Sequence, residues 1–132
     1  MDVFTRKDYD LMVELALPAA AGSVTSTPIQ LQPVGKPCLL EGELEIIAPD
    51  MTTGQLPDAA TAVYAIVHGD DPESLNWLAT IGTLTGAGGA GSVGSTWRFR
   101  PPSTCKSYVA LKVTTSAAVD VSALKANIDV VV

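Results

Sequence analysis

The chain has 132 residues, of which 47% are hydrophobic and 17% are charged, and its formal net charge is −6. This length fits one domain, and the apolar content indicates a packed globule and excludes a disordered segment. Nucleic acids and anionic membranes are bound mainly through excess Lys and Arg, so the acidic balance argues against both partners.

Residues 15–22 end in small side chains, as a signal-peptidase site does, but acidic residues precede them and interrupt any apolar core. We therefore expect no cleaved leader. Residues 9–17 can be read as a strand, although residues 8–16 also have helix-like spacing. No apolar run reaches the roughly 20 residues that span a bilayer.

Short runs of alternating polar and apolar residues follow, separated by Gly, Pro, Asp and Ser. In residues 38–47, Glu43 and Glu45 share one side while Leu44 and Ile46 share the other, which predicts a half-buried strand. The other predicted strands are residues 27–32, 62–68, 77–84, 95–100, 107–115 and 124–132.

These runs predict an all-β, single-domain β-sandwich, jelly-roll-like, with seven to eight antiparallel strands. We expect residues 24–132 to form the sandwich and residues 1–23 to be an N-terminal arm or edge segment. The two cysteines, Cys38 and Cys105, have no CxxC spacing; we favour structural thiols in a protein made in the cytoplasm, with a disulfide as the alternative.

Residues 86–91 satisfy the G-x-G-x-x-G pattern of dinucleotide-binding loops. That pattern works only where a helix follows, and here the chain leads into another predicted strand, so we interpret the segment as a connecting loop. His68 is the sole histidine, and the acids after it lack calcium-loop spacing. No catalytic, metal or cofactor residue is therefore predicted, and an enzyme is disfavoured.

Aromatic residues make up only 5% of the chain, and we expect Trp97 to lie in the core. Exposed aromatic platforms are typical of sugar-binding modules, so a carbohydrate-binding domain stays open as an alternative. Arg98 and Arg100 fall on the side of their strand opposite Trp97 and Phe99. This pair could be an ordinary solvated strand face or could bind an acidic patch on a partner.

Several segments, taken in order, resemble the capsid cement proteins of tailed phages, of the type found in a Bordetella phage. The matching segments are residues 26–31 (STPIQL), 35–39 (GKPCL), 65–71 (AIVHGDD), 99–102 (FRPP) and 107–111 (SYVAL). The resemblance covers most of the chain from about residue 24.

The resemblance implies a viral structural protein, a capsid cement or decoration protein on the outer surface of the virion head. Its expected partners are the major capsid protein, whose subunits it would bridge, and itself, as a homodimer or homotrimer. Such a protein gains avidity by binding a lattice that already exists.

We expect capsid contact in the N-terminal segment, which could add to a neighbour's sheet edge, and at the two arginines. The candidate contact residues are Phe4, Tyr9, Leu11, Met12, Arg98 and Arg100. Other virion components of similar fold, such as a head-tail or tail-associated domain, remain open beside the carbohydrate-binding domain.

Overall fold

A computed structural model of the chain describes residues 7–36 and 42–131, with residues 7–11 described by their backbone alone. Nine β-strands form within these ranges, and no helix does. The strands are β1 (Lys7–Ala16), β2 (Gly22–Thr25), β3 (Ile29–Gln30), β4 (Glu43–Ala48), β5 (Thr61–Asp71), β6 (Ser74–Thr85), β7 (Ser95–Phe99), β8 (Tyr108–Thr115) and β9 (Lys125–Val131).

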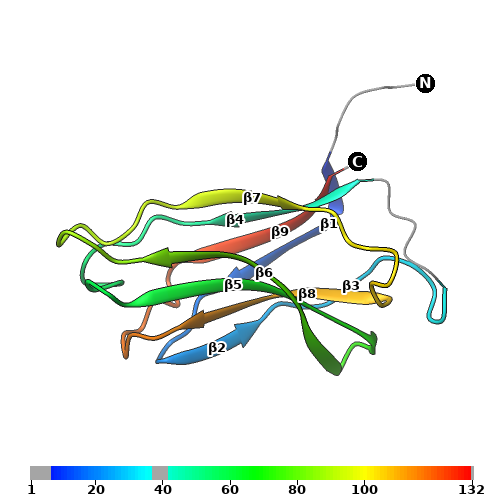
Figure 1. Cartoon of the computed structure of the whole chain (residues 1–132), viewed down its shortest axis with the longest axis horizontal. Helices are drawn as coiled ribbons and strands as arrows, with labels where there is room; N and C mark the ends of the chain where they lie inside the picture. The colour runs from blue at the N-terminus through cyan, green and yellow to red at the C-terminus, as the bar shows by residue number, and fades with distance from the viewer. Residues whose placement is uncertain (1–6, 37–41, 132) are drawn as a thin grey trace.

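The strands lie in two stacked layers (Figure 1). One layer, here called sheet A, has the order β1-β9-β4-β7; the other, sheet B, has the order β2-β8-β5-β6, with the short β3 also paired to β8. All pairings between these strands are antiparallel. This is the all-β sandwich that the alternating runs predict.

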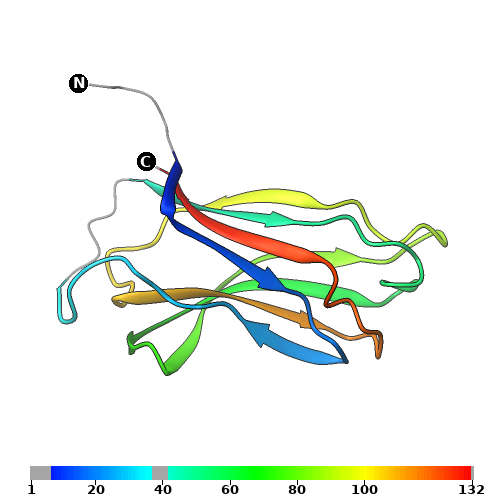
Figure 2. The same cartoon turned by 180° about the vertical axis from the view of Figure 1, so that it is seen from behind.

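The strand order is that of a jelly roll. Four antiparallel pairs are nested along the chain: β1 with β9, β2 with β8, β4 with β7, and β5 with β6. Figure 2 shows the outermost pair, with β1 in blue beside β9 in red, although most of the chain separates them in sequence. Eight strands in two such sheets define the double Greek-key jelly roll.

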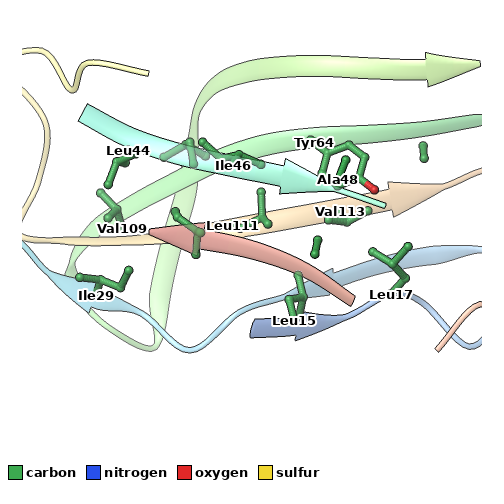
Figure 3. Close-up of a cluster of buried hydrophobic side chains, with 14 of the residues drawn as sticks. Leu15, Leu17, Ile29, Leu44, Ile46, Ala48, Tyr64, Val109, Leu111 and Val113 are labelled. Atoms are coloured by element: carbon green, nitrogen blue, oxygen red, sulfur yellow. The ribbon is translucent and has the colours of Figure 1, made fainter. Parts of the chain in front are cut away.

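The core fills the space between the layers, where alternate side chains of both sheets meet (Figure 3). Tyr64 of β5 is fully buried there, and Trp97 of β7 packs on it with ring centroids 5.2 Å apart, as expected for a core tryptophan. Burial raises the pKa of the Tyr64 phenol to about 12. Gly82 permits this contact, because a Cβ there would overlap the Trp97 ring.

The N-terminal segment from Lys7 is a strand, so the helix-like spacing of residues 8–16 is overridden. β1 lies at the edge of sheet A, where Leu15 joins the core and pairs with Ala126 of β9. The expected division near residue 23 falls inside β2. Pairing with β9 gives the apolar residues of β1 a core to face, which an isolated helix would lack.

The glycine-rich segment connects β6 to β7 without a helix, which confirms that it is a connecting loop between two strands. It packs against the loop between β4 and β5. The Oδ1 atoms of Asp50 and Asp58 accept hydrogen bonds from the backbone N–H groups of Gly94 and Gly89, at 2.5 and 2.9 Å. Gly91 has φ +67°, and a Cβ there would overlap backbone atoms of Met51 and Thr52.

Candidate functional site: two outer sheet faces

The outward side of sheet B, here called the B face, is defined by strand register. Side chains of paired residues on neighbouring strands point to the same side of the sheet. Residues paired with core residues therefore point inward, and the residues between them point outward. Four rows cross the B face: Ser23, Thr114, Val63 and Thr83; Thr25, Lys112, Ala65 and Thr80; Ala110, Val67 and Trp77; Gln30, Tyr108 and Gly69.

The B face is apolar or hydroxyl-bearing almost throughout. Among the residues of these rows, only Lys112 carries a charge. Ala65, Val67 and Ala110 are buried yet do not belong to the core cluster between the sheets, so neighbouring side chains on the B face cover them. Low charge together with aromatic side chains is typical of the centre of a protein interface.

Trp77 is the prominent side chain of the B face, and it is 66% exposed. Its indole Nε1–H donates a hydrogen bond to the Thr80 hydroxyl at 3.1 Å. Because Thr80 lies on the same strand in the next row, the indole lies along β6 instead of projecting straight away from the sheet. The hydrogen bond fixes the ring in an orientation that leaves much of its surface open.

Two β-bulges in β6 turn Trp77 outward. Trp77 pairs with Val67, whereas the next paired residue of β6, Ala79, pairs with Ile66 of the core. A second irregularity lies between Thr80 and Gly82. Trp77, Thr80 and Thr83 therefore share one side at a spacing of three, although simple alternation puts Trp77 and Ala79 on the same side. No residue pattern marks these bulges, so the sequence alone does not identify Trp77 as a surface residue.

The outward side of sheet A, here called the A face, is charged. Arg98 of β7 lies opposite Glu45 of β4, and its Nε and Nη2 both donate to Glu45 Oε2, at 3.2 and 3.0 Å. Glu45 and its register neighbour Asp129 of β9 are buried, at 6% and 1% exposure. Buried carboxylates are tolerated where ionic or hydrogen-bonding partners hold them, and these two are held.

The sequence-predicted contact residues fall at the two opposite edges of sheet A. Tyr9, Leu11 and Met12 belong to β1, and Met12 is 46% exposed; Phe4 lies outside the described residues. Arg98 is in β7 at the other edge, and Arg100 follows that strand at an exposed position. Since β9 and β4 separate the two groups, the fold does not bring them together into one patch.

One end of the sandwich is held by polar contacts between β5 and the loop before β8. His68 Nδ1 accepts a hydrogen bond from the backbone N–H of Lys106 at 3.0 Å, and Asp70 Oδ2 lies 3.6 Å from Lys106 Nζ. Burial lowers the pKa of His68, with a further lowering from the Lys106 charge, against a raising effect of Asp70.

The depressions found on the described part of the molecule are open at the surface. One of about 250 Å³ is lined by Lys36, Asp70, Lys106 and loop residues. Within residues 7–36 and 42–131, no three His, Cys, Asp or Glu side chains are placed to hold a metal ion. Those same ranges contain no helix that is long and apolar enough to cross a membrane.

The chain shows little similarity to known proteins. No protein-family model matches the chain, and no curated protein matches it. Among solved structures it is similar to a CBM32 domain of AlyQ, determined in complex with 4,5-unsaturated mannuronic acid. That similarity has 16% identity and a TM-score of 0.35, covering 98% of this chain and 94% of the other.

Proposed function

We propose that the chain is a non-enzymatic structural protein that decorates a phage capsid and stabilises it by bridging major capsid subunits. The observation that carries this proposal is the exposed Trp77 on the nearly uncharged B face. A large aromatic residue among buried small apolar ones is typical of a surface that is covered in an assembly.

The two faces give a bridging protein the two contact surfaces that it needs. The A face carries the predicted capsid contacts, namely Met12 near one edge and Arg98 and Arg100 near the other. The B face offers a second surface of different chemistry on the opposite side of the sandwich. A protein bound through one face can then use the other to hold a neighbour, so several weak contacts act together.

The test is co-sedimentation of the purified chain with phage heads stripped of their decoration protein, read as copies bound per head. Saturation near the copy number of the major capsid protein supports the proposal. Binding of a few copies only points to a head-tail or tail-associated component, and no binding contradicts any role on the head. Heat release of packaged DNA, with and without the chain, measures stabilisation.

A carbohydrate-binding module is the second candidate function, and the orientation of Trp77 is the observation that favours it. An indole held along its strand by Thr80 can stack on a pyranose ring. Titration of Trp fluorescence with a saccharide panel separates the two candidates. A saturable change that is lost in Trp77→Ser, without head binding, favours the sugar-binding module.

A further inference from the structure

We propose that the B face is the contact surface for a second copy of this chain, with Trp77 and Lys112 as its main contacts. This inference rests on the proposed function, because it names the partner of one of the two faces. It goes beyond that function in stating which surface forms the homo-oligomer and with what geometry.

Charge is the first argument for a second copy. Each copy carries a net charge of −6, so two copies repel each other unless their contact avoids acidic side chains. The A face has Glu43, Glu45 and Asp129, and the turn between β5 and β6 has further exposed acids. The rows of the B face contain no acidic residue, so this face allows two copies to approach at the least electrostatic cost.

Shape and symmetry give the second argument. Trp77 stands on β6 at one side of the B face, whereas β8 and β2 lie at the other side. A two-fold axis along the strands, between β5 and β8, brings each Trp77 over β8 and β2 of the other copy. There it meets the exposed Thr25 and the partly exposed Lys112, so a bulky ring rests on a small side chain beside a cation.

The size of the B face predicts a weak dimer. Four strands spaced about 4.8 Å apart and about six residues long give a patch of about 20 Å by 20 Å. That is on the order of 400 Å² per copy, about half of what a standard interface buries. We therefore expect dissociation constants in the upper micromolar range in solution, with association driven on a capsid by the high local concentration.

Sedimentation velocity of the full chain from about 10 μM to 1 mM tests the inference. We expect a reversible monomer–dimer equilibrium, accompanied by a concentration-dependent blue shift of Trp emission as Trp77 leaves water. Trp77→Ser should raise the dissociation constant at least about tenfold and remove the shift. The matched control is Val93→Ser, which removes an apolar side chain that is 80% exposed and lies outside the B face. This variant should change the dissociation constant less than twofold.

A charge reversal gives an independent measurement. Lys112→Glu should weaken the dimer at least about fivefold at low salt, because it places acids on both apposed faces. Lys125→Glu makes the same change in net charge at an exposed position on β9 of sheet A and should have little effect. Circular dichroism melts confirm that each variant is folded.

Three outcomes overturn the inference: a wild-type chain that stays monomeric at 1 mM, a dimer that Trp77→Ser and Lys112→Glu leave unchanged, or Trp77 emission that responds only to a saccharide. These outcomes are separable from failure of the proposed function. A chain that dimerises through the B face and does not bind heads contradicts the capsid role alone. A monomeric chain that saturates heads contradicts the dimer alone.

Discussion

The A face and the B face have the same backbone architecture and opposite chemistry. On the A face, Arg98 and Glu45 bind each other, and the buried Asp129 is also held within the chain. On the B face, Trp77 is 66% exposed, and its described hydrogen bond goes to Thr80 of its own strand. Charged groups of the A face bind within the chain, whereas the B face exposes the Trp77 indole, whose burial would stabilise the proposed dimer.

The first prediction concerns the buried carboxylate of the A face. Glu45→Ala removes the acceptor of two Arg98 hydrogen bonds, so the free energy of unfolding should fall by about 2 kcal/mol. Urea denaturation measures it. Glu43→Ala on the same strand should change the value by less than about 0.5 kcal/mol, since Glu43 is only partly buried. Equal losses in the two variants would contradict a stabilising role of the Glu45–Arg98 ion pair.

A smaller loss is expected from the other partner of the same ion pair. Arg98→Lys keeps the charge but replaces the planar guanidinium, whose Nε and Nη2 both reach Glu45, with a single ammonium. The free energy of unfolding should fall by about 1 kcal/mol, read from the same denaturation curves. If Arg98→Lys also weakens head binding while Glu43→Ala does not, the guanidinium contacts the capsid as well.

The next prediction sharpens the role of the B face. Thr80→Val removes the acceptor of the Trp77 N–H without changing the shape of the side chain. Because both residues are exposed, stability should change by less than about 0.5 kcal/mol, whereas freeing the indole should weaken dimerisation about threefold. Sedimentation velocity measures the second effect. Unchanged association would show that the Trp77 orientation is immaterial.

The smallest effect is a pH dependence at the end of sheet B. Burial lowers the pKa of His68 in the folded chain, so the unfolded chain binds more protons once the pH falls below the ordinary value near 6.5. The His68 contribution to stability is therefore present above that pH and is lost below it. Thermal melts between pH 7.5 and 5.5 should show a smaller decrease for His68→Gln than for the wild type.

Most of the fold follows from residue alternation alone. The alternating runs that predict β4 and β9 have the inward and outward sides that the structure shows. Leu44, Ile46 and Ile128 lie in the core. The β1 segment was ambiguous because its apolar residues fit both a strand and one side of a helix, and only pairing with β9 decides between them. The jelly-roll strand order depends on long-range pairs, and it agrees with the predicted architecture.

The candidate site could not be predicted in the same way. Arg98 was recognised as outward-pointing, but its partner Glu45 comes from a strand 53 residues away, and sequence alternation does not give the register between them. Residue alternation does not distinguish Trp77 from the aromatic residues of the core. Its orientation depends on two irregularities of β6 that appear only when the strand is paired with β5.

Those two bulges make the register with β5, and not the residue numbering within β6, the determinant of what the B face displays. Deleting Leu78, the extra residue between Trp77 and Ala79, would leave these two residues paired with Val67 and Ile66 in plain alternation, so the indole would still point outward. In an alignment, such a deletion is a one-residue gap in an edge strand, easily dismissed as trivial. Here it would keep the aromatic surface and bring Trp77 and Thr80 to the two-residue spacing of an ordinary strand, so related sequences should be compared by their register with β5 first.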